Sequence, residues 1–283
     1  AHASSSPELG RSALDAVELM NVGANYMREH MPSTARIHYA MINGGGIAPN
    51  VVQAEATVRY LIRARELDEL HGLVERVKKI ADGAALMTET SVSYDVVSGD
   101  ANLIGNTPLE QLMYRKLEAL GPPQFDAADR AFAEEIRSTL SEQDIRAAYA
   151  RFGLPVKLDV PLCDIIFPPE NGDGRHVGST DVGTVSWVVP TVQMRGATYA
   201  IGTPGHSWQL VAQGKSPAAH KGMAHAAKVM AATASDLFRD PALIDAAKAD
   251  FAKRRDGRPF INPIPDDVMP PITQPPVIKK DIG

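Results

Sequence analysis

Two residues have the types and positions that could do chemistry, and each lies in a glycine-rich turn close to a short apolar run. Asp181 follows Gly-Ser-Thr and precedes Val-Gly, and His206 lies in Gly-Thr-Pro-Gly-His-Ser-Trp, after the apolar run 197–201. A histidine on a loop at the end of a strand is well placed to bind a metal or to transfer protons. The ordinary alternatives are an Asx-turn for Asp181 and a backbone-bonded loop residue for His206.

Other candidate groups favour structural interpretations. Glu134 and Glu135 are adjacent in an expected helix, so they do not share a face and indicate a solvated charged surface. His220 and His225 lack the i, i+4 spacing of a zinc-binding pair on a helix. Gly44-Gly45-Gly46 precedes a strand rather than a helix, so it does not indicate a phosphate-binding loop.

The composition sets limits on the class of protein. A length of 283 residues allows one large domain or two modest ones, and the net charge of −5 argues against a nucleic-acid-binding protein. No apolar run approaches the ~20 residues that span a bilayer, so we expect no membrane partner. Because no signal peptide is visible and the single cysteine, Cys163, cannot form an internal disulfide, we expect a cytoplasmic location.

The first hundred residues predict the order helix, strand, strand, helix, strand. Ser12 and Asp15 have capping-box spacing at the start of the first helix, and Pro32 closes it. The expected elements are a helix over 14–31, strands over 35–43 and 51–64, a helix over 67–81 and a strand over 87–97. One more strand before Ala1 would complete a split β-α-β-β-α-β, ferredoxin-like unit, so the chain is expected to be truncated.

The strand over 51–64 has two different faces. Apolar residues alternate along it from Val52 to Ile62, and the polar residues between them include Arg59 and Arg63. One face would therefore cover a core, and the other would meet solvent or a ligand.

The chain changes character after about residue 106. A helix is expected from Pro108 to Leu120, and helical segments continue through Arg151. After Gly153, short apolar runs separated by Pro and Gly are typical of strands and loops in an α/β domain. A further helix over 217–238 precedes a Pro-rich tail, which we expect to be extended or mobile. The sequence predicts an α/β fold with domains at 1–106 and 107–283.

Several motifs together resemble the M20 metallopeptidase and amidohydrolase family, and the resemblance covers essentially the whole chain. The motifs are His2-Ala3-Ser4, Pro49-Asn50-Val51-Val52, Gly178-Ser179-Thr180-Asp181-Val182-Gly183, Ser186-Trp187-Val188-Val189-Pro190 and Gly202-Thr203-Pro204-Gly205-His206-Ser207-Trp208. The resemblance implies a zinc-peptidase-type α/β catalytic domain interrupted by a lid that dimerises. Residues 1–106 would be the lid, and 107–283 would be the C-terminal part of the catalytic domain.

The resemblance also implies roles for three lid residues. His2 looks like the catalytic histidine that reaches across the dimer and helps to polarise the scissile carbonyl. Asn50 looks like a substrate-binding asparagine. Arg63 occupies the position of an arginine that binds the substrate carboxylate, for which a guanidinium fork is well suited. Arg59, on the same face of the strand, is the fallback.

In the second domain, His206 looks like the last metal ligand of the family, and Asp181 looks like a supporting acid. The implied protein is a metal-dependent amidohydrolase that cleaves N-acyl or N-aroyl amino acids such as p-aminobenzoyl-glutamate, with two zinc or manganese ions. The resemblance places a His-x-Asp motif, a bridging acid and a Glu-Glu pair upstream of the lid, and none of these upstream groups is in this sequence. Because a zinc site needs three or four protein ligands, we expect this chain alone to be inactive.

Two further expectations follow from the resemblance. The intact protein would form a homodimer through the lid, and a second subunit could carry the remaining half of the catalytic domain. The alternative is a truncated, non-catalytic chain that only dimerises or binds a ligand. The metal content per chain distinguishes the two.

Overall fold

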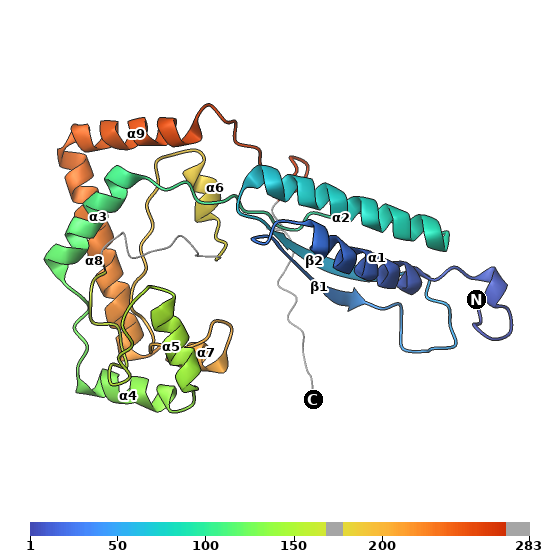
Figure 1. Cartoon of the computed structure of the whole chain (residues 1–283), viewed down its shortest axis with the longest axis horizontal. Coiled ribbons are helices and arrows are strands. Elements are labelled where there is room, and N and C mark those ends of the chain that lie inside the picture. Colours follow the sequence, from blue (N-terminus) through green and yellow to red (C-terminus); the bar gives the residue numbers. More distant parts are fainter. Residues whose placement is uncertain (168–177, 270–283) are drawn as a thin grey trace. The chain divides into compact units, whose positions relative to one another are not determined.

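The computed structural model describes residues 1–167 and 178–269, and the chain divides into two compact units. The first unit comprises Ala1–Asn102 together with the segment that begins at Ile261, and the second comprises Leu103–Phe260 (Figure 1). The last part of the tail that we expected to be extended or mobile, 270–283, lies outside the described residues.

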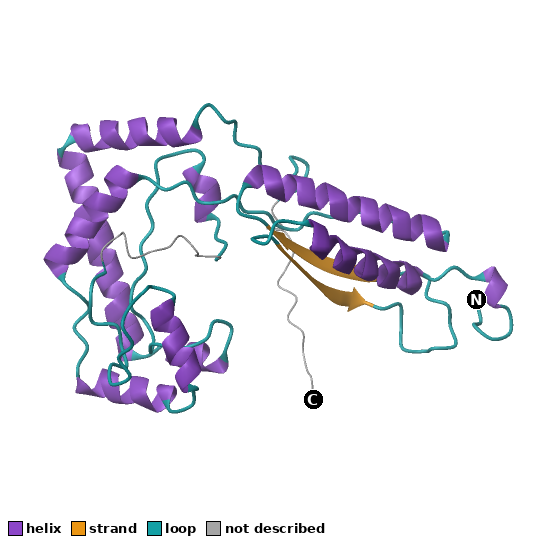
Figure 2. Cartoon of the chain, in the orientation of Figure 1, coloured by secondary structure: helices purple, strands orange, loops and turns teal. Residues whose placement is uncertain are grey.

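The first unit packs two long helices on a small sheet. Its elements are η1 (Pro7–Leu9), α1 (Ala13–Met27), η2 (Arg28–His30), β1 (Arg36–Asn43), β2 (Thr57–Arg63) and α2 (Leu67–Thr88). The strands pair antiparallel, with Ile37 opposite Ile62 and Tyr39 opposite Tyr60. Both helices lie along the same side of this sheet (Figure 2). The expected first helix begins as predicted, because the Ser12 side chain accepts a hydrogen bond from the backbone of Asp15.

The core of this unit lies between the sheet and the helices. Met27, Ile37, Leu73 and Val77 are buried there, and Ile37 is fully buried. Tyr60 packs against the same cluster, and its hydroxyl donates a hydrogen bond to Asn21 Oδ1 at 2.6 Å. Burial, with a smaller contribution from Tyr39, raises the pKa of Tyr60 to about 12, so the phenol stays a neutral donor.

The sheet is smaller than predicted. The strand expected over 51–64 is limited to β2, and 89–97 forms no strand in the part of the chain that the structure describes. The Tyr94 hydroxyl instead donates to the backbone oxygen of Lys78 on α2 at 3.2 Å. Strand-forming residues need a neighbouring strand to accept their backbone hydrogen bonds, and local sequence does not supply one. The fold is therefore mixed α/β, but its described residues do not complete the split β-α-β-β-α-β unit.

The second unit consists of helices and long connections. Its helices are α3 (Thr107–Leu120), α4 (Ala127–Arg137), α5 (Glu142–Ala150), α6 (Val182–Ser186), α7 (Trp208–Gln213), α8 (Pro217–Arg239) and α9 (Pro241–Arg255). The strands that we expected after Gly153 are absent from its described residues. The apolar segment 197–201 is held by separate contacts instead: Ala200 N donates to the Gln213 side chain at 2.7 Å, and Ile201 N donates to Pro161 O at 2.9 Å.

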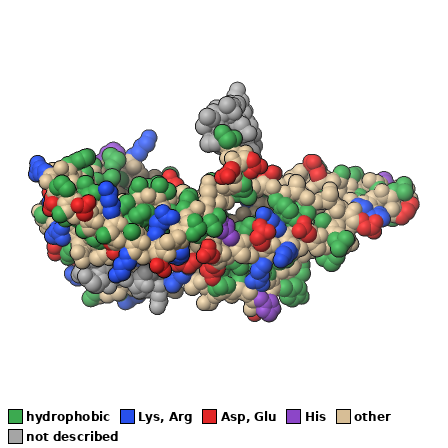
Figure 3. Space-filling view, turned by 90° about the horizontal axis from the view of Figure 1, so that it is seen from above, with side chains coloured by type: hydrophobic (Ala, Val, Ile, Leu, Met, Phe, Trp, Pro, Cys, Tyr) green, Lys and Arg blue, Asp and Glu red, His purple; other side chains and the backbone are tan. Residues whose placement is uncertain are grey.

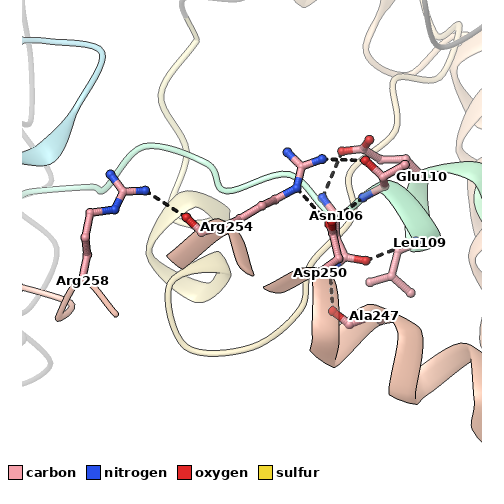
Figure 4. Close-up of polar contacts among 8 residues, drawn as sticks. Asn106, Leu109, Glu110, Ala247, Asp250, Arg254 and Arg258 are labelled. Carbon is pink, nitrogen blue, oxygen red and sulfur yellow. Dashed lines mark hydrogen bonds and ion pairs between the residues drawn. The ribbon is translucent and has the colours of Figure 1, made fainter. Parts of the chain in front are cut away.

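A buried polar network joins the first and last helices of the second unit (Figure 4). Asn106 is 1% exposed; it caps α3 and donates from Nδ2 to Ala247 O on α9 at 2.8 Å. Asp250 accepts from the backbone of Thr107 at 3.1 Å and from Arg254 Nε at 2.8 Å. Because each buried polar group has a partner here, the network fixes α9 against the start of α3.

The face of the molecule drawn in Figure 3 shows no large field of one charge. Acidic and basic side chains are interspersed over the face of the molecule drawn in Figure 3, with hydrophobic groups between them. Among the helices that the structure describes, none is both long enough and apolar enough to cross a bilayer.

Candidate functional site

Residues from both lid motifs meet at one place in the first unit. The segment around His2 pairs with the segment around Val51 as an isolated antiparallel bridge. Ala3 N donates to Asn50 O at 2.9 Å, and Val52 N donates to Ala1 O at 3.0 Å. The structure therefore places His2 and Asn50, which are far apart in the sequence, on neighbouring backbone segments.

The ring of His2 is oriented by backbone groups of the turn that follows it. Nδ1 lies 3.2 Å from the backbone nitrogens of both Ser4 and Ser5, and each N–H donates to it. Since Nδ1 accepts these bonds, the proton of the neutral ring belongs on Nε2. His2 is exposed, so Nε2–H is available to donate to a ligand oxygen. The Asn50 side chain is exposed as well and forms no hydrogen bond with the described residues.

Arg63 is the last residue of β2, and it is half-buried. It lies directly opposite Arg36 in the sheet register, and Arg59 lies opposite Ala40. Alternation along the strands turns all three arginines to the face that the helices do not cover. Sequence analysis identified Arg63 and Arg59 but missed Arg36. Side chains alternate between the two faces of a strand, and applying this alternation to 36–43 would have identified Arg36 as well.

Asp181 lies at the start of the short helix α6, and its side chain is exposed and does not cap the helix. The helix behind it is firmly held. Ser186 is fully buried, accepts a hydrogen bond from Ile104 N at 2.9 Å and donates to Gly183 O at 2.5 Å. Trp187, which is 3% exposed, stacks near Phe260 with ring centroids 6.2 Å apart. Asp181 is thus an exposed acid on a rigid support.

His206 lies in a tight turn before α7 and is exposed. It follows no strand, so the expected position at the end of a strand is wrong. Its φ of 58° is left-handed, a conformation that His adopts more readily than most residues. Gly202 begins this turn with φ of 96°, and a Cβ there would lie 2.9 Å from Ile145 Cγ1, so the motif needs glycine. The turn therefore presents His206 to solvent.

The described residues do not form a metal site. No group of three or more His, Cys, Asp or Glu residues that could hold an ion occurs within 1–167 and 178–269. A zinc ion needs three or four protein ligands, so His206 with Asp181 would not be sufficient. The donor set of these described residues does not fit a complete metal centre.

Two of the residues interpreted as structural have structural contacts. His225 is 9% exposed, and its Nε2 lies 2.6 Å from Gly121 O, at the end of α3. Glu134 forms an ion pair with the buried Arg137 at 3.0 Å.

The lid motifs lie in a region that matches a known protein domain. Residues 1–88 match the peptidase dimerisation domain of the M20 family. Over 280 residues the chain is 44% identical to one of the subunits of p-aminobenzoyl-glutamate hydrolase from Escherichia coli (strain K12), a match that covers 95% of this chain and 58% of the relative. The chain therefore contains an M20 peptidase dimerisation domain, over residues 1–88.

More distant M20 relatives carry a different name. The chain is 26% identical over 252 residues to Xaa-Arg dipeptidase of Mus musculus, a match that covers 88% of this chain and 48% of the relative. It is 25% identical over 265 residues to Xaa-Arg dipeptidase of Homo sapiens, covering 93% of this chain and 50% of the relative. The chain thus spans roughly half the length of the curated relatives that it matches.

Proposed function

We propose that this chain is the lid and the C-terminal part of the catalytic domain of a cytoplasmic M20-type amidohydrolase. Its substrates would be N-acyl or N-aroyl amino acids such as p-aminobenzoyl-glutamate. The observation that carries the proposal is the pairing of His2 with the Asn50 segment, which leaves Nε2–H and an amide side chain exposed together. The 44% identity to part of a p-aminobenzoyl-glutamate hydrolase supports the substrate class.

Each lid residue would act on a different part of the substrate. His2 donates its Nε2 proton in a hydrogen bond to the scissile carbonyl oxygen and stabilises the negative charge that develops there. Asn50 contributes an amide group beside it. Arg63 binds the carboxylate of the amino acid and sets the position of the amide bond.

The intact enzyme would use divalent metal, zinc or manganese, and two ions as the family resemblance implies. His206 would supply one ligand and Asp181 would support the site. Since the described residues contain no group of three or more such side chains, the remaining ligands would come from outside the described residues.

The lid would also form the dimer. The match of residues 1–88 to a dimerisation domain supports this assignment. In a complete split β-α-β-β-α-β lid, a strand that precedes α1 would run between β2 and 89–97. Both segments would then have a neighbouring strand for their backbone hydrogen bonds.

A non-catalytic chain that only dimerises or binds a ligand is the second candidate. It is favoured by the lack of a metal-binding cluster in the described residues. The full-length protein with its neighbouring sequence and this chain alone would be compared for zinc and manganese content and for hydrolysis of p-aminobenzoyl-glutamate. We expect metal and turnover in the full-length protein and neither in this chain. Absence of both from the full-length protein would favour the second candidate.

A further inference from the structure

The sheet face turned away from α1 and α2 is entirely cationic in its charged residues. Ile37, Tyr60 and Ile62 pack toward the helices, so alternation places Arg36 and His38 of β1 on the opposite face. Arg59 and Arg63 of β2 lie on that face too. Neither strand contains Asp or Glu, although the chain as a whole carries a net charge of −5.

The register concentrates these cations rather than separating them. Arg36 and Arg63 are direct cross-strand partners. Arg36 donates from Nη1 to Ser33 O at 2.5 Å and to Ala35 O at 2.6 Å, so its Nε and Nη2 groups are the ones that would meet a ligand. Arg59 and His38 are exposed and form no hydrogen bond or ion pair with the described residues. Same-face neighbours on a strand are about 7 Å apart, so Arg59 and Arg63 lie about 13 Å apart along β2. The distance that the cations span is therefore greater than the length of a single amino-acid ligand.

The chemistry of the row favours carboxylates over nucleic acid. Guanidinium groups bind carboxylates through two parallel hydrogen bonds. The two strands place no Tyr, Phe or Trp ring on this face, since Tyr39 and Tyr60 turn toward the helices, so His38 offers the one small ring on which a base could stack. Ala40 and Leu61 lie between the cations and would contact the aliphatic part of an acidic side chain.

We propose that this face binds an oligocarboxylate, specifically an oligoglutamyl chain. Arg36 and Arg63 bind a carboxylate at one end, and Arg59 binds another about 13 Å away. His38 lies beside the chain between them. The inference rests on the proposed function only in sharing Arg63 with it, and binding does not require hydrolysis.

The test is calorimetric titration of this chain with tetraglutamate, with N-acetylglutamate and with a single-stranded oligonucleotide. We expect saturable binding of tetraglutamate, weaker binding of N-acetylglutamate, and weakening of both by salt. Arg59→Gln and Arg36→Gln should each weaken tetraglutamate binding about threefold to tenfold, and Arg59→Lys should weaken it less. Lys79→Gln removes an exposed cation from α2 and should have no effect. Thermal melting checks that each variant is folded.

Three results would overturn the proposal: no binding of tetraglutamate, equal weakening by Lys79→Gln, or tighter binding of the oligonucleotide. Binding that persists while the full-length protein fails to hydrolyse p-aminobenzoyl-glutamate would count against the proposed function alone. Hydrolysis without tetraglutamate binding would count against this inference alone.

Discussion

The position of one proton decides what His2 can do. Its Nδ1 accepts from the N–H groups of Ser4 and Ser5, which leaves Nε2–H as the group that faces outward. We therefore predict that His2→Ala in the full-length enzyme lowers kcat by about a hundredfold to a thousandfold, as loss of an oxyanion donor does, with KM little changed. Steady-state kinetics with p-aminobenzoyl-glutamate measures both constants.

Ser4→Ala is the matched control for His2. It removes a hydroxyl 3.1 Å from Nδ1 but keeps the backbone donor, so kcat should change little. If His2→Ala raises KM and leaves kcat unchanged, the histidine binds the substrate without stabilising the developing charge.

The carboxylate is the second feature of the substrate that a single residue would recognise. We predict that Arg63→Ala lowers kcat/KM tenfold to a hundredfold, because a charge-assisted pair contributes roughly 1.5–3 kcal/mol and about 1.4 kcal/mol is one decade. Lysine should rescue only partly, since it offers a point charge without the fork. The assay compares an N-acyl amino acid with its carboxamide analogue. Equal losses on both substrates would show that Arg63 does not recognise the carboxylate.

At the scale of elements, one lysine ties α8 to α4. Lys221 Nζ lies 2.7 Å from Asp126 Oδ2 and also contacts the buried Asp129. The hydrogen bond from Lys221 lowers the pKa of Asp126 below 3.8, and the bonds to Asp126 and Asp129 raise the pKa of Lys221 above 10.5. A lowered carboxyl pKa stabilises the fold above the unfolded pKa, and a raised amine pKa stabilises it below the unfolded pKa.

The two pKa shifts predict the pH range over which the ion pairs of Lys221 stabilise the fold. The difference in melting temperature between the parent chain and Lys221→Met should be full between about pH 4 and 10. It should shrink as the pH falls below that range, where Asp126 is protonated, and as it rises above, where Lys221 loses its charge. Lys228→Met, on an exposed position of α8, should show no such pH dependence. A difference that is constant from pH 3 to 11 would rule out the electrostatic origin.

Helices were predictable from this sequence because their signals are local. Ser12 accepts the cap hydrogen bond expected of it, and the helix expected over 217–238 begins at Pro217, with Ser216 as its cap. The strands were predicted less well, since 89–97 and 197–201 have strand-like residues but no neighbouring strand among the described residues. Strand pairing depends on a partner that is distant in the sequence, so the residues of one segment do not predict it.

The candidate site shows the same limit. The sequence motifs identified His2 and Asn50, but not the pairing of their backbones or the Ser4 and Ser5 donors that orient the ring. Arg36 was missed because its importance lies in its cross-strand partner. Contacts across the sheet depend on register, and register depends on the packed core rather than on local residue type.

For the molecule as a whole, α1 offers a surface suited to a second copy. Leu19, Val22 and Tyr26 are 38%, 50% and 73% exposed, and their helical spacing places them on one stripe. This stripe lies within residues 1–88, the part that matches a dimerisation domain. The sheet also ends at β1, whose outer edge has no strand partner among the described residues. An exposed apolar stripe and an open strand edge are both surfaces that association would cover.

We therefore predict that Val22→Glu converts the full-length protein from a dimer to a monomer. A buried charge without a partner is costly at an interface, whereas on the surface of a monomer it is tolerated, so folding should be unaffected. Light scattering coupled to size-exclusion chromatography gives the mass, and circular dichroism checks the fold. Leu86→Glu on α2 is the matched control, because Leu86 is 81% exposed and lies off the stripe. Dissociation by Leu86→Glu but not by Val22→Glu would place the interface on α2 instead. If His2 acts across the dimer, the Val22→Glu monomer should also lose activity to the same extent as His2→Ala.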